Sequence, residues 1–140
     1  MCVGYGFDAI WLLCHYYLMA FEVEFTDEFD AWWNSLDEAE QESVDDSVRQ
    51  LMAVGPSLGR PDVDTLKGSR FPNMKELHVQ HAGRPIRVFF AFDPRRVAMV
   101  LLGGDKTGKK RFYEEMIPKA EAIYAQHLRE LEREKTETEG

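Results

Sequence analysis

Hydrophobic and polar residues alternate most regularly in the middle of the chain. Residues 74–81 alternate with a period of two, which predicts a strand with one apolar face. Residues 86–92 (IRVFFAF) are β-branched and aromatic, as in a central strand, and residues 97–102 (VAMVLL) are apolar enough for burial on both faces. Turn residues at 82–83 and 93–96 separate the three runs. The pattern predicts a three-stranded antiparallel meander.

The chain before the meander changes to a helical spacing. Residues 21–25 (FEVEF) predict a short N-terminal strand, and residues 55–73 predict a loop rich in proline and glycine. Between them we expect a two-helix hairpin, with Thr26 capping the first helix and an Asp37–Glu40 capping box opening the second. The first helix has one apolar stripe, which we interpret as core: Phe29, Trp32, Trp33 and Leu36.

A C-terminal helix follows the meander. Its apolar stripe consists of Tyr113, Ile117, Ala120, Tyr124 and Leu128 or Leu131. Pro118 lies within this stripe and removes one backbone donor, so the helix either kinks there or consists of two pieces. The order strand, helical hairpin, meander and helix defines an α+β fold.

The two ends of the chain differ from this pattern. Residues 1–18 contain no Lys or Arg and are too short to span a membrane, so we expect a dispensable extension before a native start at Met19. The domain then covers residues 19–131. Residues 132–140 are strongly charged and predict a flexible tail.

Charge is distributed unevenly along the 140 residues. The net charge is −8, but residues 67–111 carry eleven Lys or Arg against three acids, so the predicted sheet region is basic. The cysteines, Cys2 and Cys14, both precede the domain, which argues against a disulfide scaffold or a cysteine zinc site and suits a reducing cytoplasm. The four histidines have no metal-binding spacing, and no glycine-rich phosphate loop is present. We expect no cofactor, metal or membrane partner.

Three stretches resemble one family of bacterial proteins. The sequence is similar to the RelE/HigB/ParE superfamily of toxins from toxin-antitoxin modules, in particular its phage-derived HigB-like branch, over residues 21–131. The resemblance implies a ribosome-dependent mRNA endoribonuclease that is neutralised by a helix-turn-helix antitoxin. It is carried by GRPDVDTLKGSRFPNMKEL (59–77), PIRVFFAFDP (85–94) and LLGGDKTGKKRFYEEMIPKAEAIYAQHL (101–128).

The resemblance also indicates site residues. Arg87 matches the arginine of the middle strand, Lys106 the basic residue after the third strand, and Tyr113 the aromatic residue that opens the last helix. The polar pair at the start of the meander is Lys75 and Glu76. Many relatives have an arginine where this chain has His78, which leaves the identity of the catalytic base and acid open.

Cleavage by the RNA 2′-hydroxyl requires a base, an acid and positive charge beside the phosphate, and it needs no metal. Arg87 suits the phosphate because its guanidinium donates two parallel hydrogen bonds, and Lys106 adds a second charge. Either Glu76 or His78 could act as base, and Tyr113 could stack on a base or orient a proton. The simpler alternative is that Glu76 only pairs with Arg87 across the sheet. Further candidates for RNA binding are Lys75, Lys67, Arg70, Arg84, Lys109, Lys110 and Arg111.

Two other functions fit the same fold. A ParE-like protein would poison DNA gyrase by binding, without nuclease chemistry. An inactive remnant would serve only as an antitoxin partner. Fold alone does not separate these functions from RNA cleavage.

Overall fold

Five strands form one sheet, with helices on both of its faces. The computed structural model describes residues 21–139, so the predicted extension at residues 1–18 and the predicted start at Met19 lie outside the described part. The elements are, in order, β1 (Val23–Phe25), α2 (Asp27–Asn34), α3 (Glu38–Val54), the 3₁₀ turn η1 (Gly55–Ser57), β2 (Val63–Thr65), β3 (Met74–His81), β4 (Arg84–Phe92), β5 (Ala98–Asp105) and α4 (Phe112–Glu139). The α+β fold is confirmed.

The predicted meander is the centre of the sheet. The strand order is β1-β5-β4-β3-β2, in which β1 runs parallel to β5 and the other pairs are antiparallel. Ala82 and Gly83 both have positive φ, 49° and 76°, as a tight hairpin turn between β3 and β4 requires. The predicted loop at 55–73 was wrong in one respect, because it contains β2. The three residues of β2, Val63, Asp64 and Thr65, lie among prolines and glycines without an alternating pattern around them.

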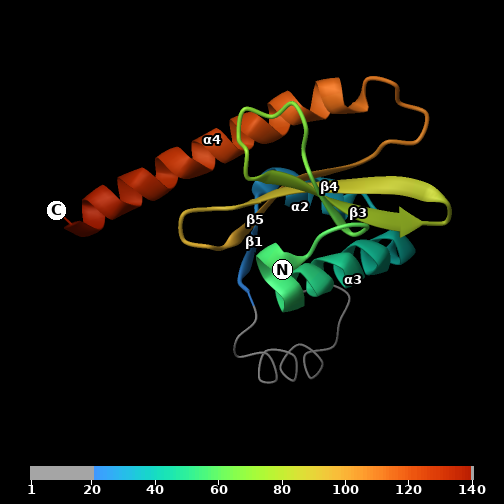
Figure 1. The fold of residues 1–140 in the computed structure, drawn as a ribbon, viewed down its shortest axis with the longest axis horizontal. Helices are drawn as coiled ribbons and strands as arrows, with labels where there is room; N and C mark the ends of the chain where they lie inside the picture. Colours follow the sequence, from blue (N-terminus) through green and yellow to red (C-terminus); the bar gives the residue numbers. More distant parts are fainter. Residues whose placement is uncertain (1–20, 140) are drawn as a thin grey trace.

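The sheet separates two hydrophobic cores. Helix α3 lies on one side of it and α4 crosses the other (Figure 1). Phe29 and Trp33 of α2 and Val44 of α3 pack with Val88 and Val100 in the first core. Met74, Phe89 and Leu101 pack with Phe112, Ala120 and Tyr124 of α4 in the second. Both faces of β4 and β5 are therefore buried, which explains their continuous apolar runs.

The predicted helix caps are present. The Thr26 hydroxyl accepts from the Phe29 N–H and donates to the Leu101 carbonyl, which joins α2 to β5. Asp37 and Glu40 form the predicted capping box of α3. Trp33 is buried as expected, whereas Trp32 is only partly buried and covers the β5 backbone at Gly103.

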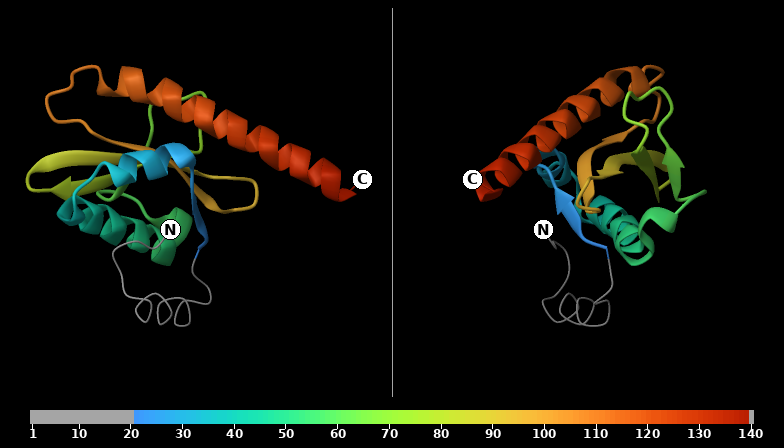
Figure 2. Two further views of the ribbon diagram at one scale, coloured as in Figure 1. Left: turned by 180° about the vertical axis from the view of Figure 1, so that it is seen from behind. Right: turned by 60° about the vertical axis from the view of Figure 1, so that its left-hand side comes forward.

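Helix α4 is one continuous helix with Pro118 inside it. The backbone hydrogen bond that Pro118 cannot donate does not divide the helix into two pieces. Figure 2 shows α4 as one helix along the sheet in two further views. The helix continues to Glu139, past the predicted end of the domain at Leu131 and through the segment expected to be a tail. None of the helices within residues 21–139 is long and apolar enough to cross a membrane.

Gly103 can be tested as a packing constraint. A Cβ at this position would overlap the ring of Trp32. We expect Gly103→Ala to lower the free energy of unfolding by about 1 to 3 kcal/mol, because overpacking displaces the indole. Gly59→Ala is the matched control, since a Cβ at Gly59 meets nothing within 4 Å. Urea unfolding measures both, and equal stabilities would contradict the close approach of Trp32.

Asp45 on α3 gives a prediction for pH dependence. Burial raises the pKa of its carboxyl from 3.8 to about 6, despite the attraction of Arg49. The folded protein therefore binds a proton between these pH values that the unfolded chain has lost, so this group's contribution to stability falls as pH rises from 4 to 6. Asp45→Asn should stabilise the protein at pH 7.5 by on the order of 1 to 2 kcal/mol, and by less at pH 4.5. Urea unfolding at both pH values tests this, with exposed Glu42→Gln as control. A gain that does not depend on pH would contradict it.

Candidate functional site

Polar residues gather on the α4 side of the sheet, at the end where β5 leads into α4. Glu76 and His78 follow Met74 on one face of β3, and Arg87 shares its face of β4 with Phe89. His78 pairs with Arg87 across the strands, and Arg87 pairs with Gly104 of β5. The strand register therefore places the predicted base candidates beside the predicted phosphate ligand.

The Glu76 carboxylate is the centre of this cluster. Its side chain is 9% exposed. One oxygen, Oε1, lies 2.7 Å from Nε2 of His78, accepts a hydrogen bond of 3.0 Å from the Tyr113 hydroxyl, and lies 3.5 Å from Nε of Arg87. A carboxylate in so little solvent is stabilised by such donors and by the arginine charge.

Arg87 is largely buried. Its side chain is only 12% exposed. Its Nη1 donates to the Ile86 carbonyl at 3.1 Å, and its Nε has no hydrogen-bond partner within residues 21–139. The pairing with Glu76 that served as the simpler alternative is present. The same contact holds the guanidinium at the base of the cluster.

Lys106 and Tyr113 complete the cluster from the other side. The Lys106 amine lies 5.1 Å from the centre of the Tyr113 ring, and Nζ donates to the phenol oxygen at 3.4 Å. Burial raises the pKa of Tyr113, and the negative charge of Glu76 raises it further, whereas Arg87 lowers it. The phenol is therefore protonated at neutral pH.

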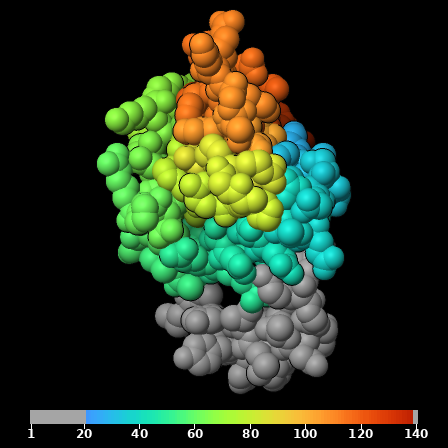
Figure 3. All heavy atoms as spheres, turned by 90° about the vertical axis from the view of Figure 1, so that its right-hand side faces the viewer, coloured from blue at the N-terminus to red at the C-terminus, as the bar shows by residue number. Residues whose placement is uncertain are grey.

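The structure separates the candidates for RNA binding into three groups. The β5–α4 loop presents the exposed side chains of Lys109, Lys110 and Arg111 next to Lys106. This loop lies against the β3–β4 turn (Figure 3). Lys67 and Arg70 are exposed on the loop between β2 and β3, where the Arg70 N–H is held by Glu121 of α4.

Two of the candidates lie apart from the cluster. Lys75 alternates with Glu76 and therefore points to the α3 side of the sheet. Arg84 forms ion pairs with Glu40 and Asp105 at 2.7 and 3.0 Å. The sequence shows that these residues are basic but not which way they point or what neutralises them.

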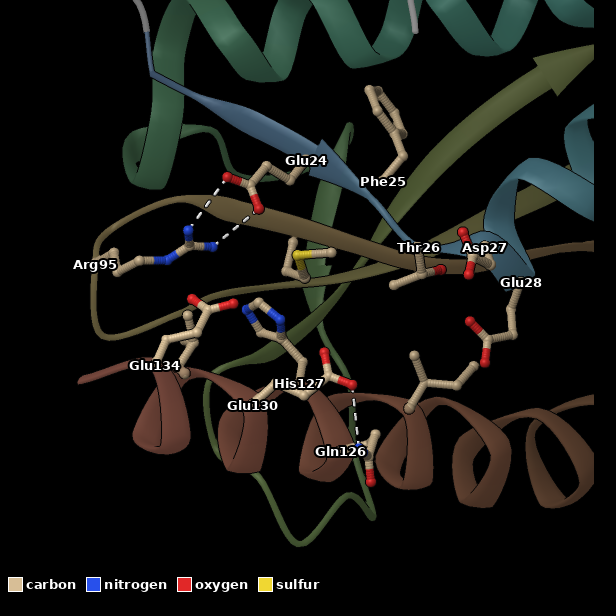
Figure 4. A pocket seen from close by; sticks show the side chains of 13 residues that line it. Glu24, Phe25, Thr26, Asp27, Glu28, Arg95, Gln126, His127, Glu130 and Glu134 are labelled. Atoms are coloured by element: carbon tan, nitrogen blue, oxygen red, sulfur yellow. Dashed lines mark hydrogen bonds and ion pairs between the residues drawn. The ribbon is translucent and has the colours of Figure 1, made fainter. Parts of the chain in front are cut away.

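A hollow of about 370 Å³ lies between β1, α2 and the C-terminal half of α4, away from the Glu76 cluster (Figure 4). Its carboxylates come from three elements: Glu24, Asp27, Glu28, Glu130 and Glu134. These negative charges repel the phosphates of a nucleic acid, whereas the cations of the polar cluster attract them. The groove was not predicted, because its acids are far apart in the sequence.

Asp93 anchors α4 beside this groove. Its side chain is fully buried, and its Oδ2 lies 2.8 Å from Nε2 of His127 and 2.7 Å from Nη2 of Arg95. Arg95 continues to Glu24 on β1. Although burial opposes the charged form, the hydrogen bonds of Arg95 and His127 leave the pKa of Asp93 below its ordinary value. The sequence indicated only a turn at this position.

Metal binding gains no support from the arrangement of side chains. No three His, Cys, Asp or Glu residues converge as metal ligands between residues 21 and 139. The cluster around Glu76 instead combines one carboxylate with an imidazole, a phenol and two cations. This set can transfer protons and stabilise negative charge.

The fold and the site define a small α+β protein with a polar cluster between sheet and C-terminal helix. Residues 31–125 match the family described as phage-derived protein Gp49-like. Two proteins of Mycobacterium tuberculosis named as toxins are similar. HigB2 is 43% identical over 76% of this chain and 54% of its own length, and HigB3 is 46% identical over 67% of this chain and 82% of its own length. The chain thus spans about half of HigB2.

A solved structure shares the fold. A mutant of E. coli toxin RelE in the free state superposes with a TM-score of 0.52 at 15% identity, over 70% of this chain and 96% of that one. The chain belongs to the Gp49-like family, and its 46% identity to HigB3 over 82% of that protein places it in the HigB family.

The central position of Glu76 can be tested without assuming any activity. Because its charge and hydrogen bond raise the pKa of Tyr113, Glu76→Gln should lower that pKa. NMR titration of the assigned tyrosine rings measures the change. Tyr124, whose pKa is raised mainly by burial, should titrate as before and serves as internal control. An unchanged Tyr113 titration would show that Glu76 does not contact the phenol in solution.

Proposed function

We propose that this protein is a toxin that acts as a ribosome-dependent mRNA endoribonuclease, and that Glu76, His78, Arg87, Lys106 and Tyr113 form its catalytic site. The observation that carries the proposal is that His78, Arg87 and Tyr113 converge on the Glu76 carboxylate from β3, β4 and α4. Lys106, from the β5–α4 loop, contacts the Tyr113 hydroxyl beside it. A structural ion pair needs only Glu76 and Arg87. It does not explain a histidine, a phenol and a lysine at the same place.

The reaction is an attack of the RNA 2′-oxygen on the adjacent phosphorus. The P–O bond to the 5′-oxygen breaks, leaving a 2′,3′-cyclic phosphate and a 5′-hydroxyl. A base must take the 2′-proton and an acid must supply a proton to the 5′-oxygen. No metal enters this scheme.

His78 is the better base of the two candidates. Its side chain is 25% exposed, whereas that of Glu76 is 9% exposed. Donation from Nε2 to Glu76 leaves Nδ1 of a neutral imidazole free to accept the proton, and the Glu76 carboxylate then stabilises the imidazolium. A carboxylate that orients a histidine and stabilises its protonated form is a recurrent arrangement for proton transfer.

Tyr113 is suited to the role of acid. Its phenol keeps its proton at neutral pH because burial and Glu76 raise its pKa. The Lys106 amine at 3.4 Å stabilises the phenolate that forms when the proton leaves. Arg87 then remains for the phosphate, where its fork matches two oxygens of the transition state.

The partners follow from the charges. The exposed Lys109, Lys110 and Arg111 adjoin the site and suit mRNA and ribosomal RNA, because contacts to phosphates dominate affinity for nucleic acids. The relatives named HigB and RelE are toxins, so we propose a cognate antitoxin of the helix-turn-helix class as the protein partner.

Arg87 provides the direct test of RNA cleavage. Arg87→Ala should lower the rate of mRNA cleavage on translating ribosomes by a factor of about 100 to 1000 and should abolish growth arrest, because it removes charge that stabilises the transition state. Arg87→Lys should recover only part of the rate, since it keeps the charge and loses the fork.

The fold must be controlled because Arg87 is nearly buried. Circular dichroism and melting should show a folded Arg87→Ala protein, and Arg129→Ala on the exposed face of α4 is the matched control that keeps full activity. A folded Arg87→Ala variant that remains toxic would contradict the proposal. Intact mRNA together with inhibited DNA supercoiling would favour gyrase poisoning, and a wild-type protein without toxicity would indicate an inactive remnant.

A further inference from the structure

Arg84 holds two distant carboxylates at once. It is the first residue of β4, and its Nη2 donates to Oε2 of Glu40 at 2.7 Å while its Nη1 donates to Oδ2 of Asp105 at 3.0 Å. Glu40 lies in the first turn of α3, and Asp105 is the last residue of β5. The Arg84 guanidinium therefore joins the start of α3 to the end of β5, where the β5–α4 loop begins.

The second oxygen of each carboxylate accepts a hydrogen bond from a backbone N–H group. Oε1 of Glu40 accepts from the Asp37 N–H at 2.9 Å in the capping box. Oδ1 of Asp105 accepts from the Thr107 N–H at 2.9 Å and from the Thr107 hydroxyl at 2.6 Å. The ion pairs thus extend from the N-terminus of α3 to the first turn of the β5–α4 loop.

Lys106 lies inside this network. It stands between Asp105 and Thr107, and its N–H donates to the carbonyl of Pro85, the residue after Arg84, at 3.0 Å. Its own carbonyl accepts from the Lys109 N–H at 3.1 Å. Pro85 and Lys109 therefore hold the backbone of Lys106, and Arg84 holds the side chain of the residue before it, Asp105. The Lys106 side chain reaches Tyr113 from this position.

We infer that Arg84 is a positioning residue for Lys106 and not an RNA contact. This inference rests on the proposed nuclease function. Arg84 faces two carboxylates, so the three groups together carry a net charge of −1 and do not attract phosphate. A small displacement of a group that acts on the reacting atoms lowers the rate by up to about 100-fold. The arginine thus acts through Asp105 and the loop.

Asp105→Asn separates positioning from charge by the sign of its effect. If Arg84 and Asp105 matter only through their charges near RNA, loss of the negative charge should strengthen RNA binding and raise kcat/KM. If they position Lys106, the same change should lower kcat about 10-fold or more, because the Arg84 ion pair is lost. An increased kcat/KM would overturn the inference.

A double-mutant cycle identifies Lys106 as the residue that Arg84 serves. Arg84→Gln should lower kcat about 10-fold in the wild-type background and less than about 2-fold once Lys106→Ala is present, because residues that act through one another are not additive. Arg84→Lys should be intermediate, since an ammonium is a poor bridge between two carboxylates. Full additivity of Arg84→Gln and Lys106→Ala would overturn the inference.

The salt dependence of RNA binding provides the matched control. Lys110→Ala, an exposed residue of the same loop, should reduce the slope of log Kd against log salt by roughly 1, as expected for a lost phosphate contact. Arg84→Gln should leave this slope unchanged. A reduced slope in Arg84→Gln would make it an RNA contact and overturn the inference.

Hydrogen exchange separates this inference from the proposed function. The amides of Lys106 and Thr107 should exchange faster in Arg84→Gln than in wild type, while that of Val88 in the centre of β4 should not change. If the wild-type protein cleaves no RNA but the two amides lose protection in Arg84→Gln, the proposed function fails and the positioning of Lys106 by Arg84 stands. Unchanged exchange would overturn the positioning role whether or not the protein cleaves RNA.

Discussion

The buried carboxylate of Glu76 is the interaction on which the site depends. Burying such a charge in the α4 face of the sheet costs free energy, which the donors from His78 and Tyr113 and the charge of Arg87 offset. Each donor comes from a different element or strand position, so the carboxylate also fixes how β3, β4 and α4 meet. Removing it would leave Arg87 as an uncompensated cation between a sheet and a helix. The polar cluster is thus a part of the packing.

The alternation of strands explains why the cluster lies where it does. On the α4 side, Met74, Phe89 and Leu101 fill the core under the helix, whereas Glu76 contacts Tyr113 in its first turn and lies beside Arg87. The β3–β4 pairing sets His78 opposite Arg87, and a slip of β4 by one residue would send Arg87 to the α3 side and away from His78. The hydrophobic cores therefore determine the register, and the register brings the polar residues together.

Local signals in the sequence were sufficient for the meander, the helix caps and the two helical faces, because alternation, turn residues and capping boxes involve neighbouring residues. Local signals did not reveal pairings between distant segments. The strand β2 was missed, and β1 was predicted as a strand but not its parallel pairing with β5. The same limit applies to the site. The family resemblance indicated Arg87, Lys106 and Tyr113, but the partners of Arg84 at Glu40 and Asp105 lie 44 and 21 residues away. Counting basic residues therefore could not distinguish a phosphate ligand from a structural bridge.

The surface of the molecule is basic near the start of α4 and acidic near its end. Tyr113 begins the helix beside the exposed cations of the β5–α4 loop, and Glu130 and Glu134 line the acidic groove near its other end. A net charge of −8 repels a polyanion from the protein as a whole, so the RNA of the proposed function would have to approach through the basic end. In that proposal the acids elsewhere disfavour orientations that keep the Glu76 cluster away from the RNA. Arg84 is neutralised by two acids, which leaves the loop cations as the charges available to a phosphate.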